Sequence, residues 1–217
     1  MAVTSPAVDT PLRGLHASPP APLPFAPSLH IRAFLLRRDE GNVVVYGAPN
    51  VDGSTFAAVG GAARAYLGHW HEATLGGDLP DVPLYVHAAD RDEVARRRHV
   101  RGAFSRRHVL DGDLEVIPIP GHTPGATAYL WEGDDHRFLF TGDTIYLRDG
   151  EWVAAVLDSS DRDAYVASLE LIRGLDFDVL VPWAAGAGQP FYAGTNPADA
   201  RARIDAILAR VRRGADH

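Results

Sequence analysis

Two histidines separated by one residue, His69 and His71, are the first groups in the sequence that could do chemistry together. They follow Tyr66-Leu67, predicted to end a buried strand, and Gly76-Gly77 beyond them allows a sharp turn. In an extended segment, residues i and i+2 point to the same side, so both imidazoles can reach one point. Imidazole nitrogens bind metal ions such as Zn²⁺ at about 2.0–2.1 Å. Such a pair is also common on surfaces and in cores, so a metal prediction needs further ligands.

Two more candidate ligands follow other predicted strands. His122 lies in the turn Pro-Gly-His-Thr-Pro-Gly (120–125), and Asp143 follows Gly142. The prolines fix their own φ angles and limit the motion of the turn. Because α/β folds place their sites where strands end at one edge of a sheet, we expect these groups to converge with the histidine pair. Three imidazoles and one carboxylate suit a tetrahedral or five-coordinate site for Zn or Fe(II).

In their order, these motifs resemble those of the metallo-β-lactamase fold superfamily, and most of all its glyoxalase II and related hydrolase branch. The motifs are His-x-His, then Pro-Gly-His-Thr-Pro-Gly, then Phe-Thr-Gly-Asp-Thr, and the resemblance covers roughly residues 30–210. It implies an α/β fold, namely a four-layer αββα sandwich of two mixed sheets with helices outside. It also implies one or two divalent metal ions at the sheet edge, which activate a water or hydroxide.

The sequence departs from this family at the positions that would hold a second metal. The family's first motif is His-x-His-x-Asp-His, and here Ala73 and Thr74 stand at its Asp and its last His. The family's late histidine would fall at about Trp183 or Ala184. The ligands of the first metal and the Asp that bridges two metals in the family are kept: His69, His71, His122 and Asp143. The resemblance therefore implies one strongly bound ion per chain, with Zn(II) expected and Fe(II) as the alternative.

Two acidic residues are candidate catalytic groups. Asp143 is expected to orient the attacking water or to act as its general base. Glu72 occupies the variable position of the first motif, where it could replace the missing Asp as a base or a ligand. The alternative for Glu72 is a solvated or helix-capping carboxylate. Thr74 carries a neutral hydroxyl, which is a poor metal ligand, and it is predicted to pack or to cap.

The composition excludes several other kinds of chemistry. The 217-residue chain has no Cys, which rules out disulfides, thiolate nucleophiles and Fe–S clusters. All 21 basic residues are Arg, so there is no Schiff-base lysine and no Walker-type phosphate loop. The net charge of −7 argues against nucleic-acid binding.

The expected setting follows from the same features. The Arg-for-Lys bias is typical of a GC-rich bacterial genome. The first residues lack the basic start and the long apolar run that are typical of a signal peptide, and no run of 18 apolar residues predicts a membrane span. We expect a bacterial cytoplasmic protein that acts on a small molecule. The oligomeric state is left open, a homo-oligomer included.

The rest of the sequence predicts the elements that position these motifs. Strands are expected at 31–36, 43–46, 82–87, 114–119, 126–131, 137–140 and 179–181. Helices are expected at 54–65, 90–98 and 161–175, and after an N-cap at Asn196. Residues 1–28 form a Pro-rich N-terminal arm, predicted to lie extended on the domain or to be partly disordered. Residues 29–217 form a single metallo-β-lactamase-like domain.

Other polar and aromatic residues favour structural roles. His87 is predicted to be structural, and His30 and His136 to be surface residues. The Arg-rich stretch 96–108, which includes His99 and His108, favours a solvated face over a site for an anion. Three aromatic residues near strand ends could line a pocket or belong to the core: Trp70, Tyr146 and Trp183.

Three functions remain open at this point. The leading one is a metal-dependent hydrolase, in which a water activated by a single metal attacks an ester, thioester, lactone or related bond. The second is a mononuclear non-haem iron dioxygenase, because related persulfide dioxygenases use two His and one Asp at the positions of His69, His122 and Asp143. The third is a non-catalytic member that keeps the fold for binding, which the loss of three family ligands supports.

Overall fold

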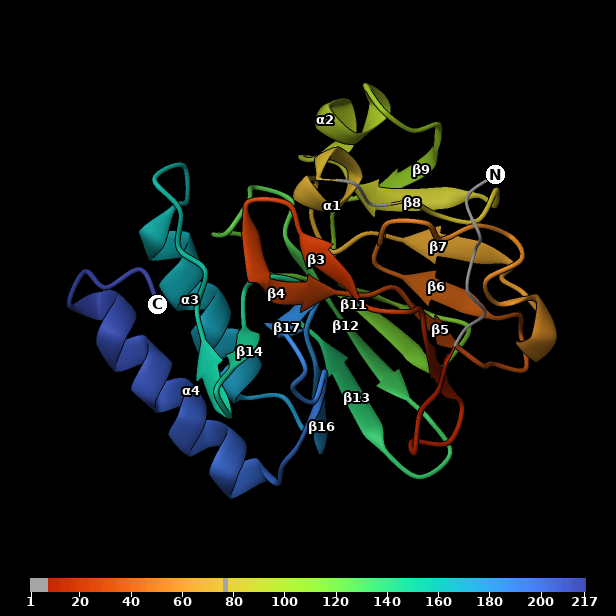
Figure 1. Cartoon of the computed structure of the whole chain (residues 1–217). Helices are drawn as coiled ribbons and strands as arrows, with labels where there is room; N and C mark the ends of the chain where they lie inside the picture. Colours follow the sequence, from red (N-terminus) through yellow and green to blue (C-terminus); the bar gives the residue numbers. More distant parts are fainter. Residues whose placement is uncertain (1–7, 76–77) are drawn as a thin grey trace.

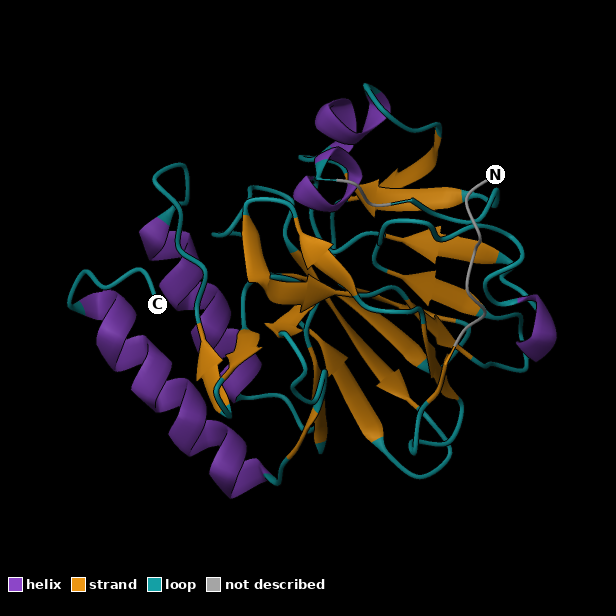
Figure 2. Ribbon diagram, in the orientation of Figure 1, coloured by secondary structure: helices purple, strands orange, loops and turns teal. Residues whose placement is uncertain are grey.

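Sheets form the two inner layers of the molecule, and helices cover both outer faces (Figures 1 and 2). The computed structural model describes residues 8–75 and 78–217. The predicted turn at Gly76-Gly77 and residues 1–7 of the predicted arm lie outside the described residues. The first layer is a seven-stranded sheet in the order β1-β2-β5-β6-β7-β8-β9. Its strands are β1 (Val8–Asp9), β2 (Leu15–Ala17), β5 (Phe34–Leu36), β6 (Val43–Val45), β7 (Arg64–Tyr66), β8 (Leu84–His87) and β9 (Val100–Phe104).

The second layer holds a six-stranded sheet and a five-stranded sheet. The six strands are β10 (His108–Leu110), β11 (Leu114–Pro118), β12 (Thr127–Glu132), β13 (Arg137–Phe140), β16 (Val179–Val181) and β18 (Ala193–Gly194). The five are, in spatial order, β15 (Glu151–Val153), β14 (Tyr146–Arg148), β17 (Ala184–Gly186), β4 (Ala26–Ile31) and β3 (Ala21–Leu23). The helices are the 3₁₀-helix η1 (Ala57–Val59), α1 (His71–Thr74), α2 (Arg91–Ala95), α3 (Arg162–Arg173) and α4 (Pro197–Arg212).

Both layers are mixed sheets. Strands β6 to β9 run parallel in the first layer, after antiparallel β5. In the second layer the β13–β16 and β14–β17 pairs are parallel and the other pairs are antiparallel. The predicted four-layer αββα sandwich is therefore confirmed.

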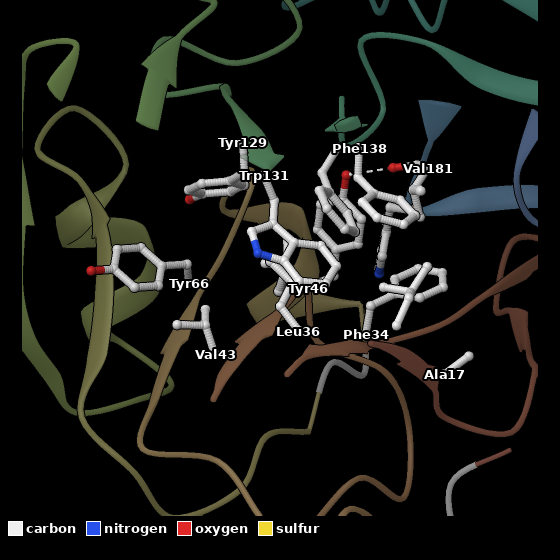
Figure 3. Packing of buried hydrophobic residues seen from close by; sticks show 14 of the residues in the cluster. Ala17, Phe34, Leu36, Val43, Tyr46, Tyr66, Tyr129, Trp131, Phe138 and Val181 are labelled. Atoms are coloured by element: carbon white, nitrogen blue, oxygen red, sulfur yellow. Dashed lines mark hydrogen bonds between the residues drawn. The ribbon is translucent and has the colours of Figure 1, made fainter. Parts of the chain in front are cut away.

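The core between the sheets follows from the alternation of side chains along each strand. Phe34 and Leu36 of β5 point into the space between the sheet layers, and Leu35 points to the outer helical side. Tyr129 and Trp131 of β12 enter the same inner space from the opposite layer (Figure 3). Successive strand residues face opposite sides, so each strand contributes side chains to two apolar clusters, one on each face of its sheet. Burial of these clusters is the main favourable contribution to folding.

Helices α3 and α4 cover the second layer, where they lie side by side (Figure 1). Helix α3 begins after Asp161, whose carboxylate accepts a hydrogen bond from a backbone N–H of the first turn. It buries Tyr165, Leu169 and Ile172, which recur at helical spacing. Helix α4 begins after Asn196, which caps it in the same way. Both starts agree with the sequence prediction.

The N-terminal segment is extended, as expected, but it is built into the sheets instead of lying on the surface of the domain. Strand β2 pairs with β5 in the first layer, and β4 pairs with β17 in the second. The hairpin β3–β4 forms one end of the five-stranded sheet. Pro22 lies in β3, an edge strand, where its missing N–H breaks no inner ladder.

Two helix predictions differ from the structure. Between residues 54 and 65 the only helix is η1, because Gly60 and Gly61 adopt left-handed φ angles of 98° and 65°, and strand β7 begins at Arg64. Helix α2 ends at Ala95 instead of residue 98, and the Asp90 carboxylate does not cap it. Within the described part of the chain, no helix has the length and apolar character needed to cross a membrane.

Candidate metal centre

The segment with the paired histidines is a turn followed by a short helix, so the prediction of an extended segment is wrong. His69 lies in the bend after β7, Trp70 has helical φ and ψ angles, and His71 is the first residue of α1. The two imidazoles still approach each other, with ring centroids 5.2 Å apart. The turn therefore brings the two rings together, in place of the strand alternation expected from the sequence.

His122 joins this pair from the other sheet layer, in the turn after β11. Its Nε2 lies 3.0 Å from Nδ1 of His71, and its ring centroid lies 4.8 Å from that of His69. One nitrogen from each of the three rings lies within 4.8 Å of the others. The side chains of His69 and His122 are only 1% and 2% exposed, so these two rings are buried.

Asp143, in the loop after β13, completes the cluster. Its Oδ2 lies 3.3 Å from Nε2 of His69 and 3.8 Å from Nε2 of His122. Gly142 before it has φ of 57°, a left-handed angle that favours glycine, and a Cβ there would lie 3.3 Å from Nδ1 of His69. The backbone N–H of Gly142 donates to the hydroxyl of Tyr46, 2.8 Å away. The structure thus brings together all four predicted ligands.

Glu72 lies behind His69 and does not face the pocket. Its Oε1 lies 3.0 Å from Nδ1 of His69 and accepts hydrogen bonds from the backbone N–H groups of Gly68 and His69. Its Oε2 accepts from the N–H of Gly47. The carboxylate is fully buried, so it is neither the solvated group nor the ligand considered from the sequence. A carboxylate behind a ligating histidine fixes the orientation of the ring and raises its basicity.

The orientation of His122 is fixed from its own far side. Its Nδ1 lies 2.7 Å from the carbonyl oxygen of Ala155, to which the ring N–H donates. This tautomer leaves the Nε2 lone pair directed at the cluster. The hydroxyl of Ser160 donates to the backbone carbonyl of His122 and helps to hold the turn.

The surrounding charges separate the pKa values of the three imidazoles. Burial lowers the pKa of His69, but Asp143 and Glu72 outweigh this effect and raise it to about 10. Burial and the charge of His69 lower the pKa of His71 to about 3 and that of His122 to about 4. Burial would raise the pKa of Asp143, but its contacts with His69 outweigh this and lower it. The centre attracts positive charge and keeps two imidazoles neutral, as metal binding requires.

The donor atoms fit one divalent cation. Neither ring nitrogen of His69 makes a regular hydrogen bond, although both are buried and a carboxylate oxygen lies near each. A buried polar atom without a partner is costly, and a cation bound at Nε2 would satisfy it. Nδ1 of His71, Nε2 of His122 and the Asp143 carboxylate would complete the set.

The positions that lack family ligands carry other contacts. The hydroxyl of Thr74 donates to the carbonyl of His71. Ala73 packs in the outer core, the apolar cluster on the outer helical side of the first sheet. Trp183 donates from Nε1 to the carbonyl of Gly47 and places its ring edge-on to His69, with centroids 5.2 Å apart. None of these groups is a ligand for a hard or borderline cation, which supports a single ion.

A pocket of about 530 Å³ opens in front of the cluster, with His71, His122 and Asp143 among its lining residues. Its walls are mostly apolar and come from both ends of the chain. They include Leu23, Phe25, Leu29, Leu75, Tyr146, Val156 and Leu157. Two of these, Leu23 and Phe25, belong to the N-terminal arm predicted at residues 1–28. The Pro-rich composition gave no sign of this role, because these residues reach the pocket only through the β3–β4 hairpin.

Asp90 is the residue that sequence reasoning missed most clearly. Its side chain is buried, and its Oδ2 accepts hydrogen bonds from the backbone N–H of Trp70 and the hydroxyl of Thr123. Its Oδ1 accepts from the N–H of Gly125. One carboxylate therefore ties the His69/His71 turn to the His122 turn. The sequence placed Asp90 only at the start of a predicted helix, and its actual partners lie in the two histidine turns.

The remaining predicted residues stay apart from the cluster. His87 is half-buried, and its Nδ1 accepts from the N–H of Ala89, which agrees with the structural interpretation. His99 and His108 lie at the surface among the arginines of the stretch 96–108. Trp70 packs against the outer core and stacks at an angle on His71.

Comparison with known proteins agrees with this arrangement. The family model described as the metallo-beta-lactamase superfamily matches residues 45–184. A hydroxyacylglutathione hydrolase of Synechococcus sp. is 31% identical over an alignment of 88 residues, and the match covers 36% of this chain and 34% of that protein. A hydroxyacylglutathione hydrolase of Anaeromyxobacter dehalogenans is 35% identical over 101 residues, which are 46% of this chain and 31% of that protein. The chain thus matches about a third of the length of these relatives.

Solved structures resemble this one over nearly its whole length. A metallo-beta-lactamase from Pontibacter korlensis has a TM-score of 0.66 at 15% identity, covering 95% of this chain and 98% of its own. An archaeal metallo-beta-lactamase superfamily protein from Sulfolobus tokodaii has a TM-score of 0.60 at 18% identity, covering 91% and 87%. At this identity the likeness concerns the fold alone.

Proposed function

The chain belongs to the metallo-beta-lactamase superfamily, and from this premise we propose that it is a single-metal hydrolase of small molecules with an ester, thioester, lactone or related bond. The observation that carries the proposal is the meeting of three buried imidazoles and one carboxylate at the floor of an apolar pocket. The hydroxyacylglutathione hydrolases among its relatives make acyl thioesters the first substrates to assay.

The proposed ligands are His69 Nε2, His71 Nδ1, His122 Nε2 and the Asp143 carboxylate. When bound, a divalent ion such as Zn(II) supplies a Lewis acid that polarises the acyl carbonyl and makes water acidic near neutral pH. Glu72 and the Ala155 carbonyl hold the rings of His69 and His122 in the tautomers that leave these nitrogens free. They act through the imidazoles and do not touch the substrate.

Asp143 has the position and charge expected of the general base. It lines the pocket, and its lowered pKa keeps it ionised at neutral pH. The carboxylate oxygen that does not face the imidazoles can therefore accept the proton of a water that attacks from the pocket side. The apolar walls exclude other water and receive the acyl group of the substrate.

A second candidate function rests on the same carboxylate. Asp143 lies within 4 Å of two imidazoles, those of His69 and His122. Two His and one carboxylate on one side of an ion are the ligands of non-haem Fe(II) oxygenases. The apolar pocket suits a hydrolase and an oxygenase equally, because either could bind a small apolar substrate there. The identity of the bound metal therefore separates these two functions.

The test begins with protein purified without chelator and analysed for metal content. We expect one zinc per chain and turnover of at least one member of a panel of acyl thioesters, aryl esters and lactones. The variant His122→Ala should lose both the metal and the turnover. The matched control is His136→Ala, which removes an exposed imidazole that pairs with Asp178 far from the cluster.

The opposing outcomes are distinct. Bound iron together with O₂ consumption would favour the dioxygenase and reject the hydrolase. Zinc bound by the wild type, with no turnover of any class in the panel, would favour the non-catalytic binding role. Unchanged metal content in His122→Ala would reject the proposed ligand set itself.

A further inference from the structure

One cationic side chain lines the pocket among mostly apolar neighbours. Arg148 is the one guanidinium among the described residues that line it, and its side chain is 61% exposed. A cation at the rim of an apolar pocket selects ligands that carry an anion on an apolar body.

The strand that carries Arg148 directs it to the pocket. Tyr146 and Arg148 of β14 both line the pocket, and Leu147 between them packs on the opposite side against the α3 and α4 layer. This alternation is that of a regular strand, so the sheet fixes the side of Arg148. Asp143 is five residues earlier in the chain, so the two Cα atoms are at most roughly 17 Å apart. Both groups are within reach of one small molecule.

The neighbouring carboxylates do not neutralise Arg148 closely. Asp149 approaches its Nε only to 3.8 Å, an exposed contact of the kind that contributes little. Gln189 holds Asp149 by accepting from its N–H and donating to its Oδ1, both at 2.8 Å. Asp216, also on the pocket wall, pairs with Arg162 at 2.5 Å. The guanidinium of Arg148 is therefore available to a ligand.

We propose that the substrate carries an anionic group, carboxylate or phosphate in kind, which Arg148 binds while the apolar part of the molecule lies on the pocket walls. This inference rests on the proposed function. The guanidinium offers paired N–H donors that match two oxygens of such an anion. In the reaction, the oxygen of water bonds to the acyl carbon and the C–O or C–S bond breaks. One proton of the water goes to the leaving group, and the acid formed releases the other to solvent.

The test uses matched 4-nitrophenyl esters that differ only in a terminal carboxylate. The neutral esters are butyrate, hexanoate and octanoate, and the anionic ones are the half-esters of succinate, adipate and suberate. The variants are Arg148→Gln and, as a control, Arg201→Gln, which removes an exposed arginine of α4. We expect Arg148→Gln to raise KM at least tenfold for the preferred half-ester, to leave kcat within about twofold, and to leave the neutral esters unchanged. Added salt should weaken the preference of the wild type.

A binding measurement separates this inference from the proposed function. Calorimetry with free adipate and hexanoate should show tighter binding of adipate by the metal-loaded wild type, and loss of that difference in Arg148→Gln. If no ester is hydrolysed but this difference appears, the hydrolase proposal fails and the anion site stands. Equal affinities and no half-ester preference at any chain length would overturn the anion site. A similar rise in KM for both ester series in Arg148→Gln would also overturn it, because Arg148 would then support the shape of the pocket and not bind the carboxylate.

Discussion

At the scale of single residues, the role of Glu72 could not be decided from the sequence. It could have been a base or ligand of the site, or a solvated or helix-capping carboxylate. Glu72 directly follows His71, which the cluster requires, so a position in the site was a natural expectation. Its carboxylate instead receives three backbone N–H groups and faces Nδ1 of His69. One of those groups belongs to Gly47, which is distant in sequence. Only the packing of the β6 end against the histidine turn reveals this.

The variant Glu72→Gln should weaken metal binding about 10- to 100-fold, because it removes the charge that orients and polarises His69. Its amide N–H₂ would also face an N–H donor at Gly47 or at Gly68, so we expect a loss of stability of about 1–3 kcal/mol. Competition with a chromophoric chelator measures the affinity, and urea unfolding measures the stability. The matched control is Glu93→Gln, which changes an exposed carboxylate paired with Arg96. Wild-type affinity in Glu72→Gln would show that the ring of His69 needs no such support.

At the scale of elements, the sequence predicted the strands that precede the ligands of the second layer well and the histidine turn poorly. It missed strands such as β9, β14 and β17, and the strand predicted at 31–36 is β5 alone from Phe34. Strand β13 and strand β16 appear at their predicted bounds, because short apolar runs flanked by polar residues have few alternatives. The Glu72 carboxylate accepts the N–H groups of Gly68 and His69 just before α1. It also accepts the N–H of Gly47, so the turn depends in part on a contact that is distant in sequence. The candidate ligands were predictable from their places after strands. The supports at Asp90 and Ala155 were not, because they pair with residues from other elements.

The link between the two histidine turns predicts a large effect of Asp90→Ala. The change leaves two backbone N–H groups and one hydroxyl without their acceptor inside the protein. We expect a loss of about 3 kcal/mol in the free energy of unfolding and weaker metal binding, because both turns lose a shared support. The neighbouring Asp92→Ala, in an exposed position of α2, is the control. Urea unfolding and metal titration measure the two effects, and a stability change equal to that of the control would contradict this role.

At the scale of the whole molecule, the cluster joins the two sheet layers. His69 and His71 follow β7 of the first layer, and His122 and Asp143 follow β11 and β13 of the second. An ion held by both groups would connect the layers in the folded state and not in the unfolded chain. Ligand binding of this kind stabilises a protein by about 4 kcal/mol when the free ion exceeds its Kd a thousandfold. Metal content and unfolding are therefore coupled.

After removal of metal with a chelator, we expect the free energy of unfolding to be highest near neutral pH. The folded pKa values of His71 and His122, about 3 and about 4, lie below the ordinary 6.5. As pH falls below 6.5, the unfolded chain therefore binds protons that the folded chain does not, and stability is lost. The pKa of His69 is raised to about 10, so its contribution is complete below pH 6.5 and is lost as pH rises towards 10. Urea unfolding at pH 5, 7 and 9 measures both slopes, and His69→Gln should abolish the alkaline one. Stability that rises steadily from pH 5 to pH 9 in the metal-free protein would contradict this account of the charges.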